Sequence, residues 1–229
     1  MFDVIGFDAD DTLWHNESIF NMTQEKFREI LSHISPEVVD KTLSSNHIKN
    51  LKVFGYGIKG FIFSMVETSI ELTNGEINGN EILKIIDSGK DMLAEPIVLL
   101  PHVKGVIDML SKKYSLLLIT KGDLFDQESK VVRSGLAEYF TAVEIVSDKN
   151  CETYKKILYR HNIAASRFLM IGNSMRSDIV PIVNIGSHAV HIPYHTTWDH
   201  EKKHPYIDPK KFKKLNHIGL LPGLIEEMA

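Results

Sequence analysis

The chain has 229 residues, of which 43% are hydrophobic and 24% are charged, and its formal net charge is −4. This length suits one large domain, or a core domain with a smaller insert. The single cysteine, Cys151, excludes an internal disulfide, and the charge lacks the basic footprint that nucleic-acid and membrane partners usually leave. No apolar run approaches the roughly 18 residues that span a bilayer. We therefore expect a cytoplasmic protein with no nucleic-acid or membrane partner.

Short apolar runs between polar turns recur along the chain, as is typical of strands buried on both faces of a parallel sheet. They are Phe2–Phe7, Ser115–Thr120, Ala142–Val146, Phe168–Ile171 and His188–Ile192. Segments with apolar residues three or four positions apart, which indicate helices, precede the last four runs. These segments are Val103–Lys112, Leu124–Ser134, Glu152–Arg160 and Ile179–Ile185. The alternation predicts an α/β fold, a Rossmann-like core with a parallel sheet flanked by helices.

Residues 15–95 interrupt this rhythm and contain no convincing strand pattern. Apolar residues from Ile19 to Ile34 share one helical face, and Ser35-Pro36-Glu37 is typical of a helix start. Two more striped segments follow, Ile58–Leu72 and Ile82–Met92. We predict an all-helical domain over 15–95, inserted into a core domain formed by 1–14 and 96–229. The tail, Leu215–Met228, is predicted to be a short helix.

The first predicted strand runs directly into an acidic cluster, Asp8-Ala9-Asp10-Asp11-Thr12. Ligands of open parallel sheets bind at the carboxyl ends of the strands. Crowded carboxylates repel one another there, and a divalent cation relieves the repulsion; oxygen ligands favour Mg²⁺. Taken alone, the cluster fits a turn or a helix cap equally well.

Other predicted strand ends carry polar residues of complementary kinds. Thr120 ends the second strand and Lys121 follows it, Lys149 follows the third, and Asn173 and Asp178 follow the fourth. A hydroxyl and a lysine can bind a phosphoryl group, and an acid can complete a metal site. Each of these residues could instead cap a helix or lie in solvent. Their ordered appearance at successive strand ends favours a shared site.

This ordered set resembles the four motifs of the haloacid dehalogenase superfamily, over residues 2–14 and about 100–192. The resemblance implies that Asp8 is a nucleophile that becomes phosphorylated and that Asp10 is the general acid and base. Thr120 would bind the phosphoryl group, and Lys149 would hold it beside Asp8. Mg²⁺ would be held by the Asp8 carboxylate, the Asp10 backbone carbonyl and Asp178.

The resemblance further implies a phosphatase with a helical cap of the C1 type, acting on a small phosphorylated metabolite. Haloalkanoic acid dehalogenases of the superfamily lack the acid two residues after the nucleophile, so Asp10 argues for phosphoryl chemistry. The insert would contact the substrate, and the glycine-rich segment 54–60 makes Tyr56 and Lys59 candidate substrate contacts.

The chain departs from the commoner pattern at three positions. Asp11 stands where glycine is usual, and Lys121 stands where asparagine is more typical, so Lys121 adds charge near the phosphate. Asn173 stands where an acid is common; it can still accept a hydrogen bond from a metal-bound water, and we expect weaker magnesium binding. A phosphomutase and a non-catalytic regulator with the same fold remain alternatives, as do a monomer and a dimer.

Overall fold

The computed structural model describes residues 2–196, 198–202 and 204–228, and only the backbone of residues 199 and 200. The chain divides into two compact units. The sheet unit combines the residues up to Glu17 with those from Ile97 onward, and the helical unit is Ser18–Pro96. Each unit has a hydrophobic core of its own, so each is described by itself.

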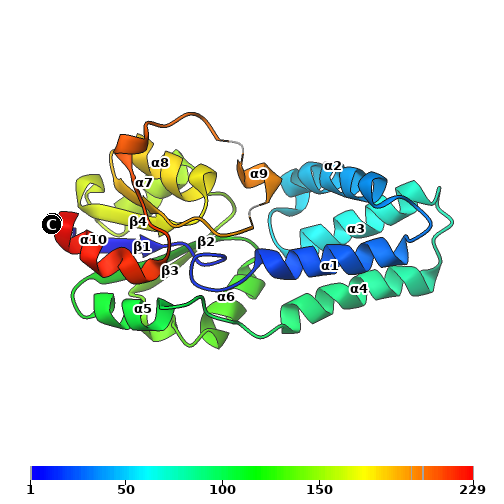
Figure 1. Cartoon of the computed structure of the whole chain (residues 1–229), viewed down its shortest axis with the longest axis horizontal. Coiled ribbons are helices and arrows are strands. Elements are labelled where there is room, and N and C mark those ends of the chain that lie inside the picture. Colours follow the sequence, from blue (N-terminus) through cyan, green and yellow to red (C-terminus); the bar gives the residue numbers. More distant parts are fainter. Residues whose placement is uncertain (1, 197, 203, 229) are drawn as a thin grey trace. The chain divides into compact units, whose positions relative to one another are not determined.

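The sheet unit is built on a parallel sheet with the strand order β3-β2-β1-β4-β5-β6 (Figure 1). The strands are β1 (Val4–Phe7), β2 (Ser115–Lys121), β3 (Ala142–Val146), β4 (Phe168–Gly172), β5 (His188–His191) and β6 (Lys213–Lys214). The chain builds outward from β1 in one direction through β2 and β3, and in the other through β4. The predicted parallel α/β fold is confirmed, with a topological switch point beside β1, where such sheets bind ligands.

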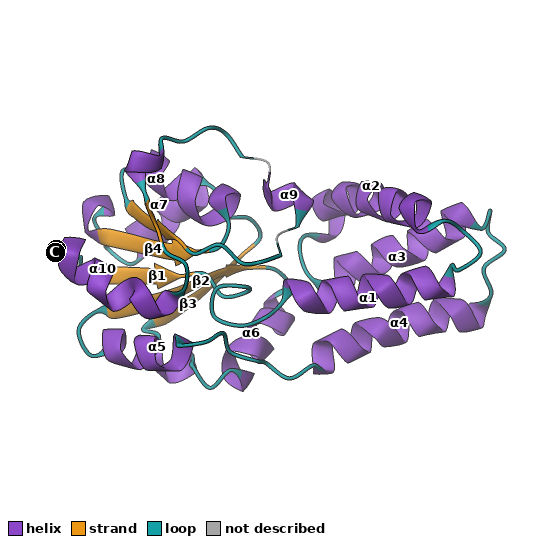
Figure 2. Ribbon diagram, viewed as in Figure 1, coloured by secondary structure: helices purple, strands orange, loops and turns teal. Residues whose placement is uncertain are grey.

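Helices cover both faces of this sheet (Figure 2). One core includes residues of α5 (Val103–Ser111), α6 (Leu124–Arg133) and α10 (Leu221–Met228); the other includes residues of α7 (Cys151–Arg160) and α8 (Val180–Asn184). In β2, Leu116 and Leu118 join the first core, whereas Leu117 and Ile119 join the second. Successive strand residues point to opposite faces, so a strand covered on both sides is continuously apolar.

Short polar residues start the helices that follow β2 and β3. The Asp123 carboxylate accepts a hydrogen bond from the Asp126 backbone N–H at 3.1 Å, at the start of α6. The Asn150 side chain accepts one from the Thr153 N–H at 3.0 Å, at the start of α7. These N-caps satisfy backbone donors that have no partner within the helix. They also fix the turns that carry Lys121 and Lys149.

The helical unit consists of most of α1 (Glu17–Ile30) together with α2 (Pro36–Phe54), α3 (Ile58–Leu72) and α4 (Gly79–Ala94). Its core is formed by apolar stripes from all four helices, including Phe27, Leu43, Met65 and Ile85. All residues of this unit are described, and none of them lies in a strand.

Two parts of the C-terminal region differ from the prediction. The segment after β5, for which the sequence predicts no helix or strand, contains a four-residue helix α9 (Asp199–Lys202) and the edge strand β6. Elements this short produce no periodic pattern, and β6 is a pair of exposed lysines. The last helix begins at Leu221 rather than Leu215, which places Pro222 in its first turn, where proline is tolerated. Within the described residues, every helix is too short or too polar to cross a bilayer.

Candidate active site

The carboxyl ends of β1, β2 and β4 meet at one edge of the sheet. Phe7 pairs with Leu118 of β2 on one side and with Ile171 of β4 on the other. The chain then leaves β1 at Asp8, whose backbone N–H donates to the Ile171 carbonyl at 2.9 Å. Thr120, predicted to end β2, lies one residue before its observed end and is buried. The sheet register therefore carries Asp8 and Thr120 to the same edge.

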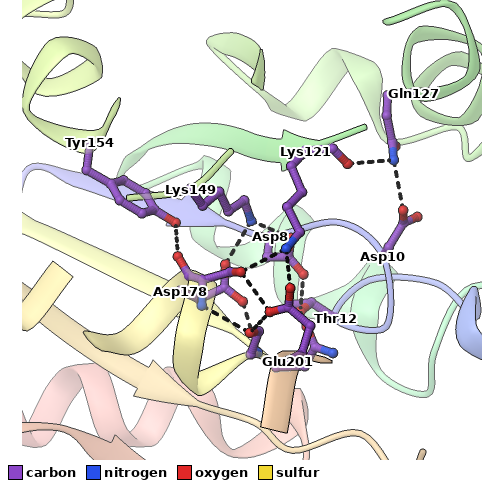
Figure 3. Close-up of polar contacts among 12 residues, drawn as sticks. Asp8, Asp10, Thr12, Lys121, Gln127, Lys149, Tyr154, Asp178 and Glu201 are labelled. Atoms are coloured by element: carbon purple, nitrogen blue, oxygen red, sulfur yellow. Dashed lines mark hydrogen bonds and ion pairs between the residues drawn. The ribbon is translucent and has the colours of Figure 1, made fainter. Parts of the chain in front are cut away.

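Asp8 is the centre of a buried polar cluster (Figure 3). Its Oδ1 accepts a hydrogen bond from Lys149 Nζ at 2.5 Å, and its Oδ2 accepts one from Thr12 Oγ1 at 2.8 Å. Thr12 Oγ1 also lies 3.3 Å from the side-chain oxygen of Asn173. Asp8, Thr12 and Lys149 are all buried, so water screens their interactions little.

Asp178 approaches the same lysine from the β4 side. Lys149 Nζ donates to Asp178 Oδ1 at 2.8 Å, and the Ser174 backbone N–H donates to Oδ2 at 3.0 Å. A Cβ at Gly172 would lie 2.3 Å from the Asp178 carboxyl group. Glycine at the end of β4 is therefore required for Asp178 to pack here. One ammonium group thus contacts two carboxylates. The three residues follow β1, β3 and β4, the strands after which the sequence predicts them.

Burial and charge shift the acid–base properties of this cluster. Burial and the charge of Asp178 raise the pKa of Asp8 to about 7, against the lowering effect of Lys149 and Thr12. Burial lowers the pKa of Lys149, but the charges of Asp178 and Asp8 outweigh it, so the pKa is raised and the ammonium form persists. The two carboxylates together carry more negative charge than the one ammonium group of Lys149 can neutralise.

This donor set fits a hard divalent cation. The carboxylates of Asp8 and Asp178 lie on either side of the same ammonium group, Lys149, and are therefore near one another. Mg²⁺ is usually held by one or two carboxylates with waters completing its shell. Among the described residues, no three histidine, cysteine, aspartate or glutamate side chains are grouped as metal ligands. A cation here would therefore rely on two carboxylates, with the amide oxygen of Asn173 nearby.

Asp10 points away from Asp8, toward α6 (Figure 3). Its Oδ1 accepts a hydrogen bond from Trp14 Nε1 at 2.7 Å, and its Oδ2 accepts one from Gln127 Nε2 at 2.8 Å. Lys130 Nζ lies 3.3 Å from Asp10 Oδ1 and 3.3 Å from Asp126. Side chains three residues apart on α6 thus hold the Asp10 carboxylate in this orientation.

Asp11 has a structural role in the turn. Its φ of 60° is left-handed, which explains why glycine suits this position. The buried Asp11 carboxylate accepts hydrogen bonds from the backbone N–H groups of Asn16 at 2.8 Å and Glu17 at 3.1 Å. Burial, followed by the charge of Asp10, raises the pKa of Asp11 to about 8.

Lys121, predicted to contact substrate, is ion-paired with Glu201 of α9 and donates to Ser177 Oγ at 2.9 Å. Tyr56 and Lys59, the other predicted substrate contacts, belong to the helical unit. Tyr56 lies in the turn between α2 and α3, next to two glycines at positive φ, and Lys59 is exposed in the first turn of α3. Their contact with substrate stays a prediction.

Several residues of these clusters have no role predicted from the sequence, among them Thr12, Gln127, Lys130 and Glu201. Thr12 was visible as part of the acidic motif. Gln127 and Lys130 are polar positions three apart on a helix whose other face is apolar, which is also the pattern of any solvated helix face. Glu201 lies in a segment without periodicity, so no signal pointed to it.

Comparison with known proteins adds independent findings. A family model for haloacid dehalogenase-like hydrolases matches residues 2–186. The curated glyceraldehyde 3-phosphate phosphatase of Methanothermobacter thermautotrophicus is 31% identical over 91 residues, 37% of this chain. The matched region spans only 40% of the length of that relative.

Two solved structures show how widely the fold is shared. A haloacid dehalogenase-like family hydrolase from Xanthomonas campestris has a TM-score of 0.88 at 35% identity, over 99% of this chain and 91% of the other. The L-2-haloacid dehalogenase of Xanthobacter autotrophicus, with chloropropionic acid covalently bound, has a TM-score of 0.70 at 13% identity over 100% of both chains. The second is a likeness of fold alone.

Proposed function

The chain belongs to the haloacid dehalogenase-like hydrolases, and from this premise we propose that it is a magnesium-dependent phosphatase of small phosphomonoesters. Asp8 would be the nucleophile that is transiently phosphorylated. The observation that carries the proposal is the pairing of Asp8 and Asp178 on one buried ammonium, Lys149, at 2.5 and 2.8 Å. An anionic nucleophile that approaches an anionic phosphate needs positive charge beside it; Lys149 supplies one such charge, and the two carboxylates leave room for a cation to supply more.

The reaction would proceed in two displacements. In the first, an Asp8 oxygen attacks phosphorus and the bond to the leaving oxygen breaks, with Asp10 donating a proton to that oxygen. In the second, water attacks the phosphorus of the aspartyl-phosphate, gives a proton to Asp10 and releases inorganic phosphate and Asp8. Splitting one difficult hydrolysis in this way is the gain of covalent catalysis, and positioned acid–base groups contribute about 10²–10⁴-fold.

Other residues of the chain would orient these groups. Thr12 holds the second oxygen of Asp8, so that the carboxylate has a defined direction. Lys149 would move its interaction from Asp8 to a phosphoryl oxygen as the new bond forms. Thr120, at the adjacent strand end, would donate to the same phosphoryl group. Asp10 would turn from Gln127 and Trp14 toward the leaving oxygen.

Asp8, Asp178 and the Asp10 backbone carbonyl would hold Mg²⁺. When bound, the ion supplies positive charge that offsets the phosphate charge facing the nucleophile. The raised pKa of Asp8 supports this assignment, because burial and the neighbouring Asp178 leave its charge incompletely compensated.

A dehalogenase is the principal competing reading, because solved dehalogenases share the fold. Asp10 favours the phosphatase, since a halide needs no proton to leave and an ester oxygen does. The curated relative is named for hydrolysis of a phosphorylated three-carbon aldehyde, which supports a small phosphomonoester as the substrate class. A phosphomutase would use the same Asp8 and Asp10 but return the phosphate to its substrate.

The test is phosphate release from a panel of phosphomonoesters, with and without Mg²⁺, by the native chain and by Asp8→Asn. We expect release that requires Mg²⁺ and is abolished by the substitution. Chloride release from 2-chloropropionate by the native chain would instead establish a dehalogenase. Phosphate transfer to a sugar phosphate without free phosphate would establish a mutase, and inactivity of both proteins on every substrate would favour a regulator.

A further inference from the structure

A carboxylate from a distant part of the chain lies beside the candidate active site. Glu201, in α9, accepts hydrogen bonds from Ser177 Oγ at 2.8 Å and from Ser174 Oγ at 2.5 Å, and it is ion-paired with Lys121 (Figure 3). Its side chain is 11% exposed. Two hydroxyls and an ammonium group thus surround one nearly buried carboxylate.

The three donors come from the strand ends that carry the proposed catalytic residues. Lys121 directly follows Thr120 at the end of β2. Ser174 and Ser177 lie in the turn after β4 that leads to Asp178, and the Ser174 backbone binds the Asp178 carboxylate. The position that Glu201 occupies therefore adjoins the catalytic cluster.

The donors are chemically suited to an anion. A buried carboxylate is costly unless it is paired and hydrogen-bonded, and here both oxygens are served. Burial by itself would raise the pKa of Glu201, but Lys121 and the two serine hydroxyls lower it to about 2. Glu201 is therefore an anion at any working pH.

We propose that Lys121, Ser174 and Ser177 form an anion subsite, which Glu201 fills in the resting protein and which receives a second anionic group on the leaving group of the substrate. The ligand is a carboxylate or phosphate group; its place on a phosphomonoester rests on the proposed function. No covalent bond changes, because one anion replaces another on the same three donors.

This exchange gives the site a selectivity that open donors would lack. An incoming group must compete with an internal carboxylate. Its apparent affinity is therefore the intrinsic affinity multiplied by the fraction of molecules in which Glu201 has left the subsite. An anionic group regains the hydrogen bonds that Glu201 gives up, whereas a neutral group does not.

The first experiment measures binding without catalysis. Inorganic sulfate is titrated calorimetrically in magnesium-free buffer, where Asp8 and Asp178 repel anions from the nucleophile itself. We expect Glu201→Gln to bind sulfate at least 10-fold more tightly than the native chain, and the gain to disappear in Glu201→Gln/Lys121→Met. Glu152→Gln is the matched control, because it removes an exposed carboxylate of α7 and should bind like the native chain.

An unchanged sulfate affinity in folded Glu201→Gln, or a gain that survives Lys121→Met, would overturn the subsite. Circular dichroism melting verifies folding, and Glu201→Ala replaces Glu201→Gln if the amide variant is unstable. A role of Glu201 restricted to fastening α9 predicts lower melting temperatures without any gain in sulfate affinity.

The second experiment compares two matched esters, 3-phosphoglycerate and glycerol 3-phosphate, which differ in a carboxylate against a hydroxymethyl group. In Glu201→Gln, kcat/KM for 3-phosphoglycerate should rise about 10-fold relative to that for glycerol 3-phosphate, whose leaving group is uncharged. Adding Lys121→Met should abolish this rise. An equal rise for both esters would assign the donors to the transferred phosphoryl group and overturn the proposal. If the native chain cleaves neither ester, the proposed function fails for this class while sulfate binding still decides the subsite.

Discussion

Three aspartates follow β1, and each of them has different hydrogen-bond partners. Asp8 is held by an ammonium and a hydroxyl, Asp10 by an indole and an amide, and Asp11 by two backbone N–H groups. Three nearby carboxylates would repel one another in a common environment. Here each carboxylate faces separate donors, so the proposed nucleophile Asp8, the proposed acid and base Asp10, and Asp11, which caps the turn, lie in different environments.

Asp11 should make stability depend on pH. Its pKa rises from 3.8 to about 8 on folding, so the folded state binds the proton more tightly. The contribution of protonated Asp11 to the free energy of unfolding is complete below about pH 4 and is lost as the pH rises toward 8. Asp11→Asn carries no charge and tolerates positive φ. Urea midpoints of the variant should therefore fall less between pH 5 and 8 than those of the native chain.

The exposed Asp87→Asn is the control for Asp11→Asn, and it should keep the native slope because its carboxylate is largely in solvent. Parallel pH curves for the native chain and Asp11→Asn would contradict the prediction.

Lys149 should be coupled energetically to the carboxylates that it joins. Lys149→Met leaves Asp8 and Asp178 without their buried cation, and breaking a buried pair costs about 3–5 kcal/mol. Part of this loss should vanish when Asp178 is also replaced by Asn, because the unpaired charge is then absent. A double-mutant cycle of urea unfolding free energies should give a coupling above about 1 kcal/mol. Additivity within about 0.5 kcal/mol would show that Lys149 and Asp178 act independently.

At the scale of elements, helix starts stabilise the fold locally. Asn78 accepts a hydrogen bond from the Glu81 backbone N–H at 3.0 Å, and the Glu81 side chain accepts one from the Asn78 N–H at 3.2 Å. This capping box satisfies two donors at the start of α4. Asn78→Ala should lower the free energy of unfolding by about 1 kcal/mol.

Asn80→Ala, two residues further along the same exposed turn, is the matched control and should be neutral, since alanine favours helix. Urea denaturation monitored by circular dichroism measures both variants. Equal effects of the two substitutions would mean that the cap contributes nothing specific.

At the scale of the whole molecule, occupancy of the proposed metal site should be visible as stability. A ligand that binds only the folded state adds RT ln(1 + [L]/Kd), about 1.4 kcal/mol at ten times Kd. Magnesium chloride should therefore raise the melting temperature of the native chain more than sodium chloride of equal ionic strength. Asp178→Asn removes one of two carboxylates and should lose most of this response. An equal response of the two proteins would exclude Asp178 as a ligand.

The sequence by itself determined the sheet unit and the residues at its strand ends. Strands covered on both faces are continuously apolar, so β2 and β4 were predictable from their composition. The shorter apolar runs in β1, β3 and β5 were predictable because they alternate with helical segments. Parallel strands bring their carboxyl ends to one edge. For that reason Asp8, Lys149 and Asp178 could be expected together before any geometry was known. The fold class and the family were confirmed.

Only the tertiary structure decided how side chains far apart in the chain meet. The contact of Asp10 with Gln127 joins residues 117 positions apart, and that of Lys121 with Glu201 joins residues 80 apart. The local sequences of α6 and the short α9 do not indicate that Gln127 contacts Asp10 or that Glu201 contacts Lys121. Secondary structure follows from local periodicity, which a sequence displays directly. The pairing of polar side chains depends on how elements pack against one another. The residues around one position in the sequence do not show which distant side chain will contact it.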